Sequence, residues 1–251
     1  MTVFDLYDMH CHLAFSPDTR ASAIALRQEG IGGMCATVTP DEYHLASLAL
    51  ADELSRNSNF KLGVGLHPWW LSDGSCGADA VDKLVAYAAE TRFIGEIGLD
   101  FAPRRAESAQ LQRTVSRASP AAARGKVLSV HAVKSAGVTL DLMESVGLVV
   151  PGAPQAPQNP QGTAVIFHWF SGSGVELARA IECGCYFPST LACFPPSAAA
   201  RMCSKSLKKN CCLKATCRPP RARNSTLEKC ARCWKRPSSI WQSCAGAASI
   251  H

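Results

Sequence analysis

The chain of 251 residues is 47% hydrophobic, which suits one large α/β domain or two small ones with a sizeable core. It contains no apolar stretch of about 18 residues or more, which excludes an ordinary membrane-spanning helix. Its first residues lack the basic and apolar segments of a secretory signal, so we expect a cytoplasmic protein with no membrane partner. No feature of the sequence indicates an obligate protein partner.

The formal net charge of +6 is distributed unevenly along the chain. Residues 1–187 carry 14 Lys and Arg against 19 Asp and Glu, whereas residues 188–251 carry 12 Lys and Arg and a single acid, Glu228. Eight of the 13 cysteines also lie in the last 64 residues. The overall charge is therefore no sign of a nucleic-acid-binding surface across the whole protein, and it divides the chain into two unlike parts.

Up to residue 187, short β-type runs alternate with segments of helical spacing. The predicted strands cover residues 3–10, 30–38, 60–67, 92–100, 126–133, 163–170 and 184–187. Helical spacing predicts helices over residues 19–30, 41–57, 77–92, 107–125, 139–147 and 174–184. The proline-rich segment 149–162 predicts a surface loop.

This alternation of strands and helices is typical of a parallel sheet in an α/β protein. Seven such units before residue 188 favour a (βα)8 barrel, a TIM barrel, over a doubly wound sheet. The first strand is not followed by GxGxxG, which weakens the dinucleotide-binding alternative.

Histidines and one glutamate stand at the ends of four predicted strands. His10 and His12 close the first strand, where alternation places both side chains on one face. Glu96 ends the fourth strand among glycines and aliphatic residues, where a buried charge would need a cation or a proton. His131 and His168 end the fifth and sixth strands. Each residue alone is compatible with a structural role, but together they predict a metal site on the barrel face that carries active sites.

The motifs DMHCH, GLHP, GEIGLD and HWFSGS, with His131 between the last two, resemble in order and spacing those of the TatD-like deoxyribonuclease family. The resemblance covers about residues 4–187. It implies a TIM-barrel hydrolase that uses one or two divalent ions, Mg, Mn or Zn, to cleave phosphodiester bonds in DNA. Other ester or amide substrates remain an alternative on the same framework, because fold does not fix function.

The resemblance also implies a role for each matching residue. His10 and His12 would hold one metal ion, Glu96 would bridge two, and His131 and His168 would complete the set of ligands. Two further matches, His67 and Asp100, are candidates for the substrate pocket.

One expected residue is missing from the chain. The family has a further ligand and probable base, an aspartate after the eighth strand in a motif like Glu-Thr-Asp-x-Pro, but no aspartate follows Asp141 here. Residues 210–218 are compatible with one possible set of codons for Glu-Leu-Leu-Leu-Glu-Ser-Asp-Leu-Pro-Pro read one base late, and residues 188–196 and 225–245 are compatible with the same shift. Leucine codons CTG read in this frame give cysteine, which also explains the cysteine excess.

We therefore hypothesise that one base is lost near Phe187–Pro188. Residues 1–187 would then form the barrel through seven strands. Residues 188–251 would be a frameshifted tail, in which the eighth strand and the final helix are lost or corrupted.

Two other interpretations of the printed chain remain open. It could be a catalytically impaired product, because a barrel that lacks a strand has open edges. The basic tail could instead be a zinc- or nucleic-acid-binding module built on Cys230 and Cys233. A zinc module normally has two such cysteine pairs at regular spacing, and this one pair is weaker evidence for it. If the tail cysteines instead formed disulfides, the protein would need an oxidising compartment, for which the sequence shows no signal.

Overall fold

The structure is a computed structural model that describes residues 6–56, 60–103, 112, 125–152, 163–188 and 211–212. Its paired strands are all parallel and follow one another in chain order. The first sheet contains β1 (Leu6–Cys11), β2 (Ile31–Ala36) and β3 (Phe60–Gly63). The second contains β4 (Phe93–Asp100), β5 (Val127–Val133) and β6 (Ala164–Phe170), and the third pairs β7 (Phe187–Pro188) with β8 (Cys211–Cys212).

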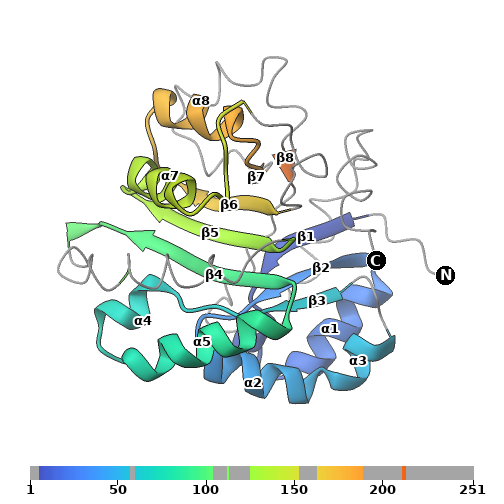
Figure 1. Cartoon of the computed structure of the whole chain (residues 1–251). Helices are drawn as coiled ribbons and strands as arrows, with labels where there is room; N and C mark the ends of the chain where they lie inside the picture. Colours follow the sequence, from blue (N-terminus) through green and yellow to red (C-terminus); the bar gives the residue numbers. More distant parts are fainter. Residues whose placement is uncertain are drawn as a thin grey trace.

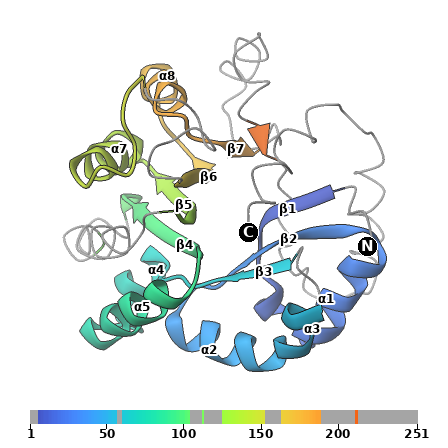
Figure 2. The same ribbon diagram turned by 45° about the vertical axis from the view of Figure 1, so that its right-hand side comes forward.

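Two isolated bridges join the three sheets into one curved wall. Val64 pairs with Ile94 between β3 and β4, and Ile166 pairs with Tyr186 between β6 and β7. Figure 2 shows the strands as an arc with the helices outside it. The predicted parallel order is therefore confirmed. Closure of the barrel is not, since no pairing between β8 and β1 occurs among the described residues.

The helices cover the outer side of the strands, with α7 and α8 on one side in Figure 1 and α1 to α5 on the other. In chain order they are η1 (Leu13–Phe15), α1 (Thr19–Gln28), α2 (Pro40–Ala49), α3 (Ala51–Arg56), α4 (Pro68–Ser72), α5 (Ala78–Glu90), α7 (Ala136–Ser145) and α8 (Gly174–Glu182). None of the described helices is long and apolar enough to cross a bilayer.

Local hydrogen bonds explain where several helices begin. The carboxylate of Asp18 accepts the backbone N–H of Ala21 at the start of α1. At the start of α8, Ser173 and Glu176 form a capping box, in which each side chain accepts the other residue's backbone N–H. Such caps satisfy N–H groups that the first helical turn leaves without partners.

Several predicted elements differ in detail from the observed ones. The helix expected over 41–57 is divided at the fully buried Leu50 into α2 and α3. The short helix α4, which begins at Pro68 after the N-cap His67, was not predicted. Most of the helix predicted over 107–125 lies outside the described residues, as does most of the proline-rich loop.

The tail is described only at its two β segments. The eighth strand, expected to be lost or corrupted, appears as the two residues Cys211 and Cys212, which pair in parallel with Phe187 and Pro188. The rest of residues 189–251 lies outside the described part of the chain, including the cysteine pair considered for a zinc module.

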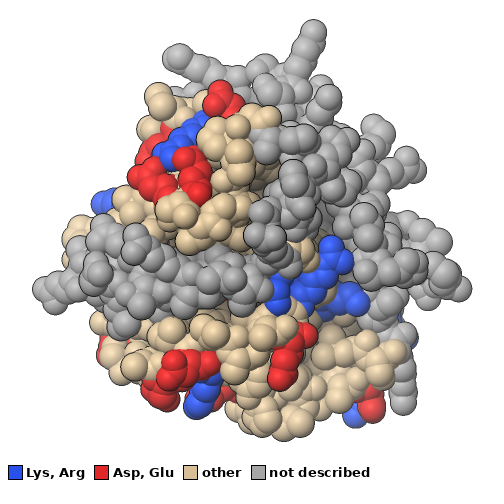
Figure 3. Space-filling view, viewed as in Figure 1, with Lys and Arg blue, Asp and Glu red and all other residues tan. Residues whose placement is uncertain are grey.

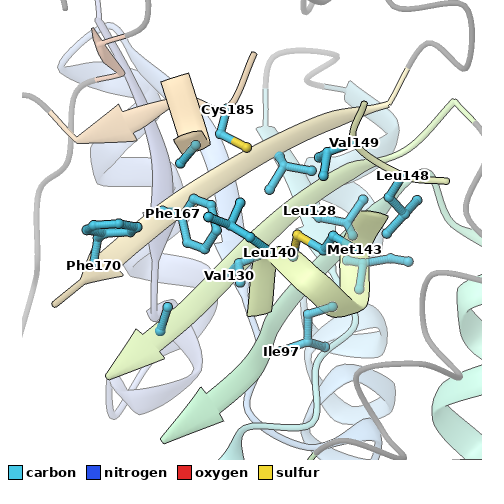
Figure 4. Packing of buried hydrophobic residues seen from close by; sticks show 14 of the residues in the cluster. Ile97, Leu128, Val130, Leu140, Met143, Leu148, Val149, Phe167, Phe170 and Cys185 are labelled. Carbon is cyan, nitrogen blue, oxygen red and sulfur yellow. The ribbon is translucent and has the colours of Figure 1, made fainter. Parts of the chain in front are cut away.

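Apolar side chains fill the space between the strands and the helices. The larger cluster packs β4, β5 and β6 against α5, α7 and α8. Figure 4 shows the part of it between these strands and α7. On β5, Leu128 and Val130 belong to this cluster, so the alternating residues Ser129 and His131 face the opposite side. On β5 the outer side is thereby apolar, and the inner side carries Ser129 and His131.

Candidate metal centre

Five imidazoles surround the buried carboxylate of Glu96, which is 3% exposed. On its Oε2 side, the Nε2 atoms of His10 and His12 lie at 3.4 and 3.1 Å. On its Oε1 side lie His67 Nε2 at 3.0 Å, His131 Nδ1 at 2.9 Å and His168 Nε2 at 2.6 Å. The structure thus brings together the five ligands predicted from the sequence, and His67 lies as close to Glu96 as they do.

Gly65 and Thr37 fix the position of Glu96. The backbone N–H of Glu96 donates to the carbonyl of Thr37 at 2.7 Å, and the N–H of Thr37 donates to the carbonyl of Gly95 at 2.9 Å. These bonds run close to Gly65, where a Cβ atom would lie 1.9 Å from the Thr37 oxygen and 2.2 Å from the Glu96 nitrogen. A glycine at this position therefore lets the end of β2 reach the backbone of β4.

Neighbouring imidazoles keep Glu96 ionised. Burial by itself would raise the pKa of this carboxyl group, but interactions with the imidazoles of His168, His67 and His10 hold that pKa well below its ordinary value. A buried carboxylate must be neutralised by partners, and here the partners are side chains that also bind metal ions.

Ser129 holds two of the histidines. Its Oγ lies 2.6 Å from Nδ1 of His10 and 3.2 Å from Nδ1 of His168, and the two rings stack with centroids 3.7 Å apart. A hydroxyl oxygen has two lone pairs and can accept from both Nδ1–H groups. With a proton held on Nδ1, each ring can use Nε2 as a ligand once a metal ion replaces the Nε2 proton. Sequence reasoning missed Ser129, although its place two residues before His131 on the same strand face could have indicated it.

His12 and His131 are held by acceptors outside the cluster. Nδ1 of His12 lies 3.0 Å from the carbonyl of Ala36, and Nε2 of His131 lies 3.2 Å from Oδ2 of Asp100. Burial lowers the pKa of both imidazoles, but hydrogen bonds to Glu96, and for His131 also to Asp100, raise it above the ordinary value. A fixed partner on one ring nitrogen decides which nitrogen faces the centre.

Asp100, predicted as a pocket residue, lies behind His131. Its Oδ2 also accepts the indole N–H of Trp69 at 2.6 Å. Burial would raise the pKa of Asp100, but the hydrogen bonds from His131 and Trp69 lower it to about 2. The structure therefore places a permanent acceptor against the outer nitrogen of His131.

The donor atoms fit a divalent ion. Two groups, His10 with Glu96 and His168, and His67 with Glu96 and His131, each have ligand atoms within 4.8 Å of one another. Imidazole nitrogens with a carboxylate are typical ligands of zinc and similar transition ions, whereas magnesium prefers oxygen. The aspartate expected from the family has no counterpart after Asp141.

A parallel α/β wall with a histidine–carboxylate cluster at its strand ends is the arrangement of metal-dependent barrel hydrolases. Over residues 7–219 the chain matches the family described as TatD related DNase, and it belongs to this family of hydrolases. The match extends beyond residue 187, where the resemblance in motifs ended. A crystal structure of a hydrolase TatD family protein from Entamoeba histolytica is similar, with a TM-score of 0.59 and 13% identity over 86% of this chain and 74% of that one. No curated protein matches the chain significantly.

Replacing Ser129 with alanine is expected to weaken binding of Mn²⁺ by about 10- to 100-fold, the usual effect of removing a group that orients metal ligands. Without the hydroxyl, His10 and His168 lose the shared acceptor that aims their Nε2 atoms. The measurement is the dissociation constant for Mn²⁺ by titration calorimetry. The matched control is Ser135→Ala, which removes another buried serine whose hydroxyl donates to the carbonyl of Leu99. Equal affinity in the two variants would contradict this role for Ser129.

Proposed function

We propose that this hydrolase cleaves phosphodiester bonds of DNA with one or two divalent ions. The proposed metal ligands are His10, His12, Glu96, His131 and His168. One observation carries the proposal: imidazole nitrogens from four separate segments converge within 2.6 to 3.4 Å of a single buried carboxylate. The description of the matching family as TatD related DNase supports DNA as the substrate.

The chain's own residues would hold and orient the ion. A bound divalent ion lowers the pKa of a water molecule and polarises a phosphoryl oxygen. Glu96 supplies the negative charge at the middle of the cluster, and its position is fixed by the backbone of Thr37. Ser129, the carbonyl of Ala36 and Asp100 keep the imidazoles in fixed orientations. Such pre-organised ligands reduce the rearrangement needed when substrate binds.

The charged side chains on the described surface bear on how DNA would bind. On the face in Figure 3, one group of Lys and Arg side chains lies near the middle, and acidic and basic side chains are mixed elsewhere. Residues 1–187 carry more acids than bases. We therefore expect binding to depend on local contacts and on the metal centre rather than on a field over the whole protein.

The test compares the printed chain with a version whose reading frame is restored from residue 188. Each is purified, freed of metal with a chelator, and assayed on a labelled DNA oligonucleotide with and without Mn²⁺. We expect metal-dependent cleavage by the restored protein and weak activity or poor solubility of the printed chain, because under the frameshift hypothesis the restored frame would supply the missing aspartate and a full eighth strand. An intact gene that encodes this tail, confirmed by mass spectrometry, would rule out the frameshift.

Two variants show whether the cleavage belongs to the proposed site. His10→Ala should lose most activity, whereas His44→Ala, which changes an exposed histidine on α2, should retain it. Cleavage that survives both the chelator and His10→Ala would contradict the proposal. Cleavage of carboxylic esters or amides, with no cleavage of DNA, would favour the alternative substrate class.

A further inference from the structure

His67 stands apart from the other imidazoles in how it is held. It follows β3 as the N-cap residue of α4, and its buried ring lies with Nε2 3.0 Å from Oε1 of Glu96. By distance alone it belongs with His131 and Glu96 among the groups that could bind a metal ion. The hydrogen bond at its other ring nitrogen, Nδ1, argues against a role as a metal ligand.

The backbone N–H of Trp69 donates to Nδ1 of His67 at 3.1 Å. A backbone amide can only donate, so Nδ1 must carry a lone pair and no proton. An imidazole with one bare nitrogen is neutral and has its proton on the other nitrogen, here Nε2. The atom that faces Glu96 is therefore an N–H donor, and a protonated nitrogen has no lone pair for a metal ion.

The other imidazoles have the opposite arrangement. Nδ1 of His12 faces the carbonyl of Ala36, and Nε2 of His131 faces the carboxylate of Asp100; both partners accept the outer proton, so the inward nitrogen can give up its proton when a metal ion binds. His10 and His168 share the Ser129 hydroxyl oxygen, which can accept from both rings. Of the five imidazoles around Glu96, His67 is thus the one whose partner requires a proton on the inward side.

We propose that His67 is a catalytic residue and not a metal ligand: its Nε2–H donates to Glu96 in the free protein and to a phosphoryl oxygen of the substrate in the complex. This inference rests on the proposed function. A phosphodiester carries negative charge on oxygens that have no bond to carbon, and that charge grows as a nucleophile attacks. A neutral, pre-oriented donor stabilises it. The N-cap bond from α4 fixes the donor's direction.

Two substitutions separate the cap from the donor. In His67→Asn the side-chain oxygen can replace Nδ1 as the N-cap acceptor, and the donor is lost. In His67→Gln the longer amide can place an N–H near the position of Nε2, and the cap is weakened. The comparison variant His12→Asn removes a proposed ligand.

The first readout is metal binding by the full chain. We expect His67→Asn to bind the same number of Mn²⁺ ions as wild type with an affinity within about threefold, and His12→Asn to bind at least about tenfold more weakly. A loss in His67→Asn as large as that in His12→Asn would overturn the proposal. Nitrogen-15 NMR of the Zn²⁺-loaded protein should show His67 protonated at Nε2. Protonation at Nδ1 would also overturn it.

The second readout is DNA cleavage, measured with the frame-restored protein and the same substitutions made in it. We expect kcat to fall on the order of 100-fold in His67→Asn, the effect of removing one donor to a developing negative charge, and less in His67→Gln. Wild-type kcat in His67→Asn, with metal binding unchanged, would refute the donor role. If the frame-restored protein binds Mn²⁺ and cleaves no DNA, the proposed function fails, while the binding and NMR measurements still decide whether His67 is a ligand.

Discussion

Replacing Glu96 with glutamine is expected to abolish tight Mn²⁺ binding and to lower metal-dependent cleavage on the order of 1000-fold. The reason is that this carboxylate is the negative group shared by all five imidazoles, at 2.6 to 3.4 Å from them. Glutamine has nearly the same size, so the packing stays while the charge is lost. The measurements are the Mn²⁺ dissociation constant and the rate at which the frame-restored protein cleaves a DNA oligonucleotide.

The matched control for this prediction is Glu53→Gln. Glu53 is also a buried glutamate, but it pairs with Arg27 between α3 and α1 at 3.1 Å and has no contact with the cluster. The control should bind Mn²⁺ as the wild type does. If Glu96→Gln binds Mn²⁺ like the control, Glu96 is not the centre of a metal site.

Replacing Gly65 with alanine is expected to destabilise the protein by about 2 to 3 kcal/mol, because an added methyl group has no room there. The new Cβ atom would meet the backbone of Thr37 and Glu96 at 1.9 and 2.2 Å, and neither backbone can move without breaking the hydrogen bond between them. For a chain of this size, we expect the melting temperature to fall by about 4 to 12 °C. Thermal unfolding followed by circular dichroism measures it.

A second consequence should accompany the loss of stability. Since the same methyl group would displace the backbone of Glu96, Mn²⁺ binding by Gly65→Ala should weaken as well. The control is Gly174→Ala at the start of α8, where a Cβ atom would meet nothing within 4 Å. Its melting temperature should stay within about 2 °C of wild type, as for most surface changes. An unchanged melting temperature in Gly65→Ala would show that β2 and β4 can separate without cost.

The fold was predictable from the order of the elements. Parallel strands are interspersed with helices along the described parts of residues 6–188, and this pattern predicts a parallel sheet with its strand ends on one rim. The boundaries were less predictable. Helix α4 spans only five residues, which is too short for a periodic pattern to show.

The membership of the site was predictable for a similar reason. His10, His131 and His168 each stand in the last part of a parallel strand, whereas Glu96, predicted at the end of the fourth strand, lies in the middle of β4. Their side chains meet because these strands form one wall. Alternation along the first strand also predicted that the side chains of His10 and His12, which are two residues apart, lie on the same side.

By itself the sequence determined which histidines and which glutamate meet, because strand order and the two-residue alternation are local properties of the chain. Only the tertiary structure decided what each imidazole does. The nitrogen that faces the centre depends on a partner from elsewhere: Ser129 is 119 residues from His10, and Asp100 is 31 residues from His131. Even the nearby bond from Trp69 to His67 exists only because the chain turns into α4 at that point. A proton's position follows from hydrogen-bond geometry, and that geometry is set when distant strands pack together.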